Sequence, residues 1–393
     1  MAETRALQQL TANSDWLTTL GWTEASPPQA WPMIVRAAEQ HGMAGVLLAR
    51  LSQSDQLDGL PSDALHALRR ATHHTRLRNQ FMLDEAERLV TTLEAAGIRP
   101  LLLKGMALLL TVYHDPSLRP MRDVDVWVRP EDLQTALTQL AAAGWRPCYP
   151  EQATDNERLF MHHVALRRDD PLAGIVELHH RWLSLPARLA RLMPEADVWQ
   201  RAVQTCVGRT PAWVLAPEDQ VLHLAAHTAW HLGNAQRLIW LCDLERVIRS
   251  AGAALDWPAV TRRAVEMRAV LPLQRTLPAA VAQFGAPVPE AVLAEVAALP
   301  VHKDEQAWYG ENALRRRSSL VAVWQRLSGL ETRRAQLHFA RSVAWPAREA
   351  MVRSYPDAHG LRLLARYSAR WLTPLRETRS WRRQQRWQRS LPE

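Results

Sequence analysis

Two aspartates separated by one residue carry the strongest chemical signal in this sequence. Asp123 and Asp125 lie in the segment DVDVWV, where polar and β-branched residues alternate as in a strand. Residues two apart on a strand point to the same face, with Cα atoms about 6.5–7 Å apart. Carboxylates held this close repel each other unless a cation lies between them, and oxygen ligands suit Mg²⁺ or Mn²⁺. The pair therefore predicts a divalent-cation site of the kind used in phosphoryl or nucleotidyl transfer.

Glu177 is the candidate third carboxylate. It lies in the apolar segment GIVELH at 174–179, where an unpaired acid would be costly. Strand alternation places Glu177 and His179 on the same face. If this strand neighbours the aspartate strand, Glu177 reaches the same metals, either as a ligand or as acceptor of a hydroxyl proton. The alternative is an ion pair between Glu177 and an arginine such as Arg167.

Lys104 and Gly105 form a candidate phosphate-binding turn. The chain has only two lysines, the other being Lys303, and Lys104 ends an apolar run. A glycine there lets backbone N–H groups approach a phosphate, and a helix that starts there favours negative charge. Arg119 and Arg122 flank the two aspartates and are predicted to contact phosphate as well. The structural alternatives are a lysine that extends to solvent from a strand end and an arginine that neutralises the aspartates.

The run LLLKGMALLLTVYHDPSLRPMRDVDVWVRPEDL resembles the uncharacterised bacterial nucleotidyltransferase family of the DNA polymerase β-like superfamily. Its downstream acid-Leu-His segment is matched by Glu177 to His179, followed by Trp182. Later matches are Leu222, His227, Trp240, Leu241 and Asp243, so the resemblance covers about residues 30–260. It implies Mg²⁺-dependent transfer of a nucleoside monophosphate from an NTP to an acceptor, with release of pyrophosphate. It also implies metal binding by Asp123 and Asp125 and a third-carboxylate role for Glu177.

Two other functions are compatible with these residues. The superfamily often has Ser after the glycine of its phosphate-binding turn, whereas Met106 follows Gly105 here. This difference leaves open a non-catalytic nucleotide- or peptide-binding protein that retains the fold. The other alternative is an RNA-directed transferase that uses the basic C-terminal tail. The acceptor itself is not identified: a small molecule, a peptide, a protein hydroxyl and an RNA end are all compatible.

Histidines on a predicted helix form a second candidate cluster. His223, His227 and His231 are spaced by four, which places them on one helix face. Two such histidines can bind zinc, but no carboxylate or cysteine nearby completes the set. We therefore favour packing of this face against the catalytic unit, with His227 and His179 on the acceptor side. Asp243 is expected to pair with an arginine.

The order of strand and helix signals predicts an α+β fold, in which a small mixed β-sheet core (βαβαββ), a nucleotidyltransferase core according to the resemblance, is embedded in a mainly helical protein. The expected divisions are an N-terminal helical region at 1–96, the core at 97–185, a C-terminal helical region at 186–360 and a basic tail at 361–393. Asp63 is expected to cap a helix that ends near residue 96. Strands are expected at 98–103, 123–128, 163–167 and 174–179, with helices at 106–113 and 130–144 between them. After residue 183 only helices are expected, near 187–200, 217–232, 236–250, 257–268, 271–285 and 304–328.

Composition limits the remaining classes. The net charge is +8, and the tail contributes most of it, with nine arginines against two acidic residues. Trp371, Trp381 and Trp387 in this tail could stack on bases, so RNA or an acidic partner is a candidate ligand, and a solvated Arg-rich helix is the alternative. Three scattered cysteines exclude a disulfide framework. No apolar run reaches the roughly 18 residues of a membrane span, so we predict a cytoplasmic protein that is not an integral membrane protein.

Overall fold

The computed structural model describes residues 15–23, 26–148, 162–170, 172–182, 195–231, 237–309, 332–346 and 357–368, with positions 327, 348, 351, 352 and 355. Residues 369–393 lie outside the described residues, and so do the three tail tryptophans expected to contact a partner. The same holds for 183–194 and 310–326, where parts of two helices were expected.

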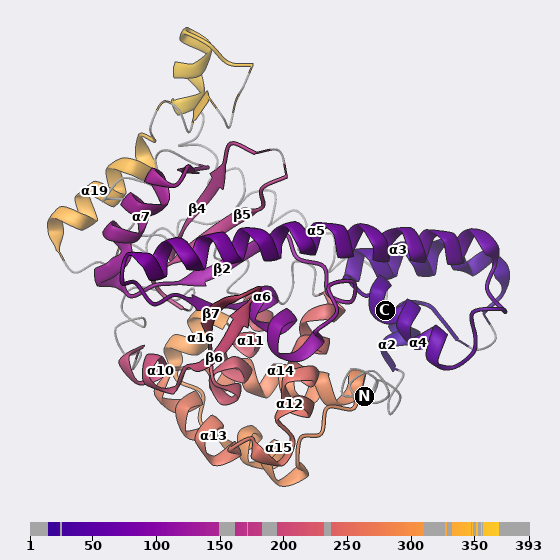
Figure 1. The fold of residues 1–393 in the computed structure, drawn as a ribbon. Coiled ribbons are helices and arrows are strands. Elements are labelled where there is room, and N and C mark those ends of the chain that lie inside the picture. The colour runs from indigo at the N-terminus through magenta and orange to yellow at the C-terminus, as the bar shows by residue number, and fades with distance from the viewer. Residues whose placement is uncertain are drawn as a thin grey trace, which may run out of the picture.

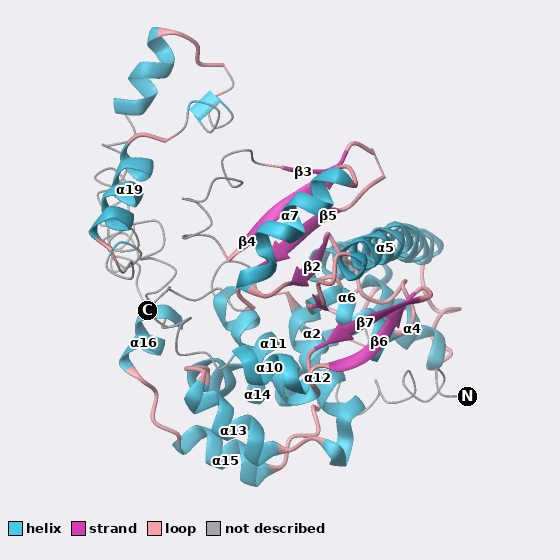
Figure 2. Ribbon diagram, turned by 60° about the vertical axis from the view of Figure 1, so that its left-hand side comes forward, coloured by secondary structure: helices cyan, strands magenta, loops and turns pink. Residues whose placement is uncertain are grey.

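The fold is α+β, with one mixed sheet of seven strands (Figure 2). The strands are β1 (Leu101–Leu102), β2 (Asp123–Trp127), β3 (Trp145–Pro147), β4 (His163–Arg168), β5 (Ile175–His179), β6 (Val203–Val207) and β7 (Thr210–Val214). Their order in the sheet is β3-β4-β5-β2-β1-β7-β6. The expected strands near 98–103, 123–128, 163–167 and 174–179 are confirmed, although the first is only two residues long.

The hairpin of β6 and β7 corrects the expectation that the chain after residue 183 is only helical. Gly208 adopts a φ of +57° in the turn between the two strands, and β7 pairs in parallel with β1. Ala212 and Val214 are buried on one face of β7. The strand forms because β1 offers an unpaired edge, and that partner lies about a hundred residues earlier. β3, which pairs with β4, was also not expected.

Helices before and within the core follow the predicted pattern. The N-terminal elements are α2 (Asp15–Thr19), η1 (Pro28–Ala30), α3 (Trp31–His41), α4 (Ala44–Gln53) and α5 (Ser62–Ala95). The expected N-cap at Asp63 is wrong: the N-cap is Pro61, two residues earlier, and Asp63 lies in the first turn of α5. Within the core, the elements are α6 (Lys104–Leu108), its π-helical continuation η2 (Leu109–Tyr113), η3 (Pro130–Asp132) and α7 (Leu133–Ala142). The long helix α5 lies across the sheet (Figure 1).

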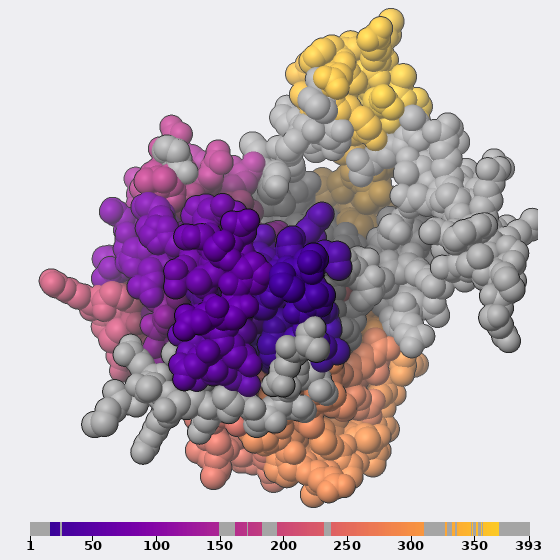
Figure 3. Space-filling model, turned by 90° about the vertical axis from the view of Figure 1, so that its right-hand side faces the viewer, coloured from indigo at the N-terminus to yellow at the C-terminus, as the bar shows by residue number. Residues whose placement is uncertain are grey.

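Helices that follow β5 in the chain pack into a bundle below the sheet (Figure 1). They are α10 (Glu195–Arg201), α11 (Pro217–His231), α12 (Leu238–Ala251), η5 (Gly252–Ala254), α13 (Trp257–Glu266), α14 (Val270–Phe284), α15 (Glu290–Ala298) and α16 (Lys303–Tyr309), with α19 (Arg333–Ala344) further along the chain. The helices expected from 217 to 285 are confirmed, whereas α15 was not expected. Figure 3 shows the N-terminal helices (indigo) above this bundle (orange) on one face. Among the described helices, none is both long and apolar enough to cross a bilayer.

Strand β2 has two chemically different faces. Val124 and Val126 are fully buried in the main core. The other face carries the two aspartates and Trp127, whose ring lies 4.6 Å from that of Trp199 in α10 and 6.1 Å from that of Trp182 (centroid distances). The carboxylates are therefore held at the rim of an aromatic layer between the sheet and the C-terminal helices.

Candidate functional site

The strand pairing brings the predicted site residues together. Because β1 runs antiparallel to β2, the end of β1 lies beside the start of β2, and the backbone N–H of Leu103 donates to the carbonyl of Asp125 at 2.9 Å. Lys104 follows directly. On the other side β5 runs parallel to β2, with Asp125 opposite Glu177 in the register. An acid from each of two adjacent strands therefore faces the first residue of α6.

Asp125 is the centre of a buried polar network. Its Oδ1 accepts hydrogen bonds from Lys104 Nζ at 2.5 Å and from His179 Nε2 at 2.9 Å. Glu177 Oε2 lies 4.0 Å from the same ammonium nitrogen and 3.4 Å from the same ring nitrogen. On its other oxygen, Glu177 is 3.6 Å from His163 Nε2. The ammonium of Lys104 thus partly neutralises the two carboxylates.

The two aspartates differ in their electrostatics. Burial favours the neutral form of Asp125, but Lys104 and then His179 outweigh it and hold the pKa of its carboxyl well below the usual range. Burial, followed by repulsion from Asp125 and Glu177, raises the pKa of Asp123 to about 6. Within the described residues, no hydrogen bond or ion pair reaches the Asp123 side chain. Asp123 is therefore the carboxylate of this group that lacks a cation.

The backbone at the turn is constrained. Lys104 has a φ of +44°, a left-handed conformation that non-glycine residues rarely adopt and that costs roughly 1–3 kcal/mol. Gly105 is required sterically, because a Cβ at this position would overlap Nη1 of Arg119 and the side chain of Met121. The sequence suggested glycine here for the approach of a phosphate. In the structure, the space beside it holds the Arg119 guanidinium.

Arg119 is anchored by a buried acid. Its Nε and Nη2 donate to the two oxygens of Asp243 at 3.3 and 2.8 Å, and Tyr113 Oη donates to Asp243 Oδ1 at 2.8 Å. The expected pairing of Asp243 with an arginine is confirmed. Burial opposes the guanidinium charge, but Asp243 outweighs it and raises the pKa of Arg119. Arg119 therefore presents a fixed positive group beside Gly105.

A cavity of about 760 Å³ opens beside this group, and we call it the arginine cavity. Its wall includes Lys104, Gly105, Arg119, Arg122, Asp123 and Arg237. Burial, then repulsion from Arg122 and Arg119, lowers the pKa of Arg237. Such mutual repulsion is relieved by an anion. Arg237 was not singled out from the sequence, although it lies within the range of the sequence resemblance and directly before helix α12, which was a usable signal.

A second cavity, of about 310 Å³, lies on the other side of Lys104 and Asp123, and we call it the histidine cavity. Its wall includes His162, His163, Glu177, His179, His223 and His227. The two cavities share Lys104, Asp123, His227 and His231. His162 and His163 were not singled out from the sequence. Adjacent histidines at the start of a strand beside the acidic strand were the signal available.

The predicted histidine face of α11 is used in two ways. His223 is buried and stacks on Trp182, with ring centroids 5.7 Å apart. The ring centroid of His227 lies 5.3 Å from that of Trp240 and 4.8 Å from that of His231. Within the described residues, the groups with metal-ligand spacing do not include these three histidines. One such group consists of Asp125, Glu177 and His179, and the other consists of His162, His163 and His179.

Comparison with known proteins places this chain in a family. The chain belongs to the uncharacterised nucleotidyltransferase family, whose sequence model matches residues 27–285. It is also similar to the crystal structure of an antigenic nucleotidyltransferase-like protein from Paracoccidioides brasiliensis, with 18% sequence identity and a TM-score of 0.37 over 56% of this chain and 97% of that chain. Comparison with curated proteins gives no match.

Proposed function

We propose that this protein is a Mg²⁺-dependent nucleotidyltransferase that moves a nucleoside monophosphate from an NTP to a hydroxyl acceptor. The observation that carries the proposal is the register of β2 and β5. It sets Asp125 opposite Glu177, with Asp123 two residues away on the same face as Asp125. These acids lie between a cavity walled by arginines and one walled by histidines. Family membership supports the same reaction class.

The residues fit a divalent cation. Asp123, Asp125 and Glu177 would hold Mg²⁺ or Mn²⁺, because carboxylate oxygens are the ligands these ions prefer. Burial, then repulsion from Asp125 and Glu177, raises the pKa of Asp123, and a bound cation would offset that repulsion. When bound, the metal would neutralise charge on the reacting phosphate and orient it.

The arginine cavity is the proposed site of the triphosphate. Arg122 and Arg237 present guanidinium groups that repel each other, and Arg119 adds a third that is fixed by Asp243. Guanidinium groups bind phosphate oxygens with paired, charge-assisted hydrogen bonds. Lys104 reaches this cavity as well as Asp125, so its ammonium would lie beside the α-phosphate end of the donor.

The histidine cavity is the proposed acceptor side. Burial alone would raise the pKa of Glu177, but the interaction with His179 outweighs burial. The net pKa of Glu177 is lowered, so its carboxylate is ionised at neutral pH. Glu177 would accept the acceptor's hydroxyl proton as the acceptor oxygen bonds to the α-phosphorus and the bond to pyrophosphate breaks. His179 positions Glu177, and His227 lies on the wall that both cavities share.

The test is release of pyrophosphate from each of the four NTPs, with Mg²⁺ and with EDTA, together with intact-mass detection of nucleotidylated peptides, proteins, small molecules or RNA. The expected result is metal-dependent release that Asp125→Asn abolishes. Asp84→Asn is the matched control, because Asp84 is exposed on α5. Equal release by wild type and Asp125→Asn would overturn the proposal.

One observation favours a second function, a non-catalytic nucleotide-binding protein. The Lys104 ammonium already contacts Asp125 and lies near Glu177, where a cation would otherwise bind. Under this second hypothesis, calorimetry would show NTP binding of equal affinity with and without Mg²⁺, and no pyrophosphate would form. Lys104→Met separates the two hypotheses. It should create Mg²⁺-dependent thermal stabilisation in a non-catalytic protein, whereas an enzyme should show that stabilisation already in the wild type.

A further inference from the structure

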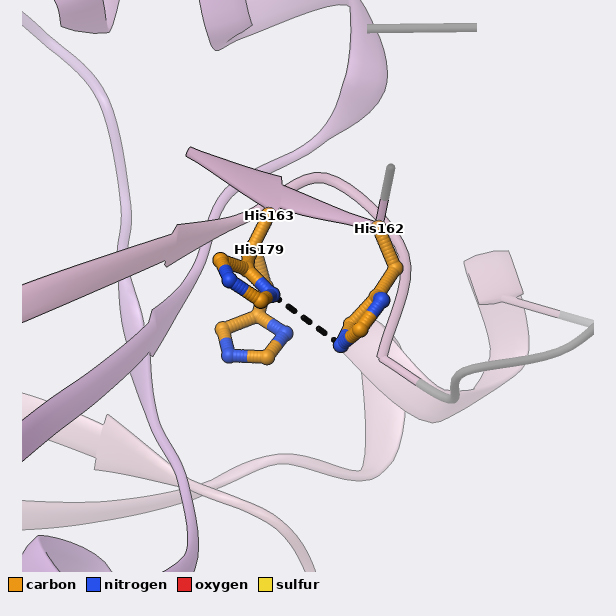
Figure 4. A group of neighbouring side chains, drawn as sticks. All are labelled: His162, His163 and His179. Carbon is orange, nitrogen blue, oxygen red and sulfur yellow. Dashed lines mark hydrogen bonds between the residues drawn. The ribbon is translucent and has the colours of Figure 1, made fainter. Parts of the chain in front are cut away.

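Three imidazole rings converge at one end of the histidine cavity. His162 Nε2 and His163 Nδ1 lie 3.0 Å apart, and one ligand nitrogen from each of His162, His163 and His179 lies within 4.8 Å of the other two. Figure 4 shows the three rings turned toward one another, with a nitrogen of each facing a common point. Nitrogens bound to one tetrahedral Zn²⁺ at 2.0–2.1 Å are about 3.3 Å apart.

Strand geometry explains this convergence. His163 and His179 are direct partners in the antiparallel pairing of β4 with β5, so their side chains share a face, and their ring centroids are 5.2 Å apart. Consecutive residues within a strand point to opposite faces. His162 avoids this because it precedes β4, in a bend, and its ring lies edge-on to that of His163 at 4.4 Å.

Asp125 prepares the third ring for a metal. The carboxylate of Asp125 accepts a hydrogen bond from Nε2 of His179, which in the neutral ring keeps the proton on Nε2 and leaves the lone pair on Nδ1. Burial opposes a charge on this ring, but Asp125 and Glu177 outweigh it and raise the pKa of His179, so a metal at Nδ1 would displace a proton. This Nδ1 is buried in a side chain only 2% exposed, and within the described residues it has no hydrogen-bond partner. A histidine oriented through its second nitrogen by a carboxylate is the arrangement that metal sites use.

We propose that His162, His163 and His179 bind a divalent transition-metal ion, Zn²⁺ or its analogue Co²⁺, with a fourth coordination position that faces the histidine cavity. This site is separate from the carboxylate site proposed for Mg²⁺, because imidazole nitrogen suits zinc and cobalt whereas carboxylate oxygen suits magnesium. The two sites meet at Asp125, which orients His179 on one side and faces Glu177 on the other.

The hydrogen bond between the other two rings fits this assignment. His162 Nε2 and His163 Nδ1 lie 3.0 Å apart, so at least one of these two nitrogens carries a lone pair that can bind a metal. The single hydrogen bond between them would be replaced by two bonds to the ion.

The experiment is a titration of the chelator-stripped, full-length protein with Co²⁺, followed by its visible absorption, with zinc content measured after dialysis. One Co²⁺ per chain is expected, with the intense bands of tetrahedral coordination and no displacement by excess Mg²⁺. His162→Ala and His163→Ala should each weaken binding at least 100-fold. The double substitution His73→Ala, His74→Ala is the matched control, because this adjacent pair is exposed on α5, and it should leave the affinity unchanged.

Two results would overturn the proposal. One is a Co²⁺ affinity that is unchanged in both the His162→Ala and the His163→Ala protein. The other is loss of Co²⁺ binding in the His73→Ala, His74→Ala control. If either site variant fails to fold, X-ray absorption of wild-type protein loaded with zinc decides instead. Three imidazole ligands support the site, and an oxygen-only shell refutes it. These measurements do not depend on transfer activity. The metal site can therefore be supported when the proposed function is refuted, and refuted when the proposed function is supported.

Discussion

The two cavities around Lys104 and Asp123 differ in how their polar groups are satisfied. The arginine cavity carries permanent charge, part of it fixed by Asp243, and its remaining guanidinium groups repel one another. The histidine cavity is walled largely by imidazole rings, and nitrogens of His179 and His223 in its wall are buried without hydrogen-bond partners in the described residues. Excess positive charge favours an anion, whereas ring nitrogens without partners favour a metal or a polar ligand. Under the proposed function, donor and acceptor would be recognised by different chemistry on the two sides of one group of carboxylates.

Asp125 should show the largest effect, because it lies in the wall of the arginine cavity and orients His179 in the wall of the histidine cavity. We expect Asp125→Asn to reduce Mg²⁺-dependent pyrophosphate release by about 1000-fold or more. The amide cannot balance the Lys104 ammonium, so the free energy of unfolding should fall by on the order of 3 kcal/mol. Release assays and urea unfolding measure the two effects, with Asp84→Asn as control. An unchanged free energy of unfolding in Asp125→Asn would show that the buried ion pair of Lys104 and Asp125 does not stabilise the fold.

Arg237 tests the arginine cavity alone. Arg237→Gln removes one of the mutually repelling guanidinium groups and should weaken ATP binding about tenfold, which corresponds to about 1.4 kcal/mol. Cobalt binding at the histidine cluster should be unchanged. Calorimetry with ATP measures the effect, and Arg209→Gln, at an exposed position in the β6–β7 turn, is the control. A matching loss in both arginine variants would show that the effect is one of overall charge.

Replacing Asp123 by Asn should raise the stability of the fold, whereas the same replacement of Asp125 should lower it. Its pKa is about 6 in the fold against an ordinary value of 3.8, so between about pH 4 and 6 the unfolded chain loses its proton first and stability falls as pH rises. Asn cannot ionise. In EDTA, Asp123→Asn should therefore melt a few degrees above wild type at pH 8 and equal it near pH 4. A melting temperature below wild type at pH 8 would contradict the repulsion inferred at this residue.

His223 should show the smallest effect. Burial lowers its pKa to about 3 from an ordinary value of 6.5, so wild type loses stability as pH falls from about 7 toward 3, where the unfolded chain takes up a proton that the fold does not. His223→Phe retains the stacking on Trp182 and removes two unpartnered nitrogens. We expect a gain of about 1 kcal/mol at pH 8, and a larger gain at pH 5. Thermal melts at both pH values measure the effect, with exposed His73→Phe as the unchanged control.

The sequence predicted the core strands and the three acids because their signals are local. Alternation in DVDVWV and an acid inside GIVELH are each visible within a few residues, and strand geometry fixes which side chains share a face. The hairpin of β6 and β7 was missed because it depends on the free edge of β1, far away in the chain. Burial and pairing of this kind override local propensity.

For this protein, the sequence alone determined which residue types are available at the site and on which strand faces they lie. Only the tertiary structure decided their partners: Lys104 with Asp125, Arg119 with Asp243, and the adjacent histidines with His179. The physical reason is that a side chain's direction follows from its own backbone. Its charge state and its ligands depend instead on groups that folding brings within a few ångströms.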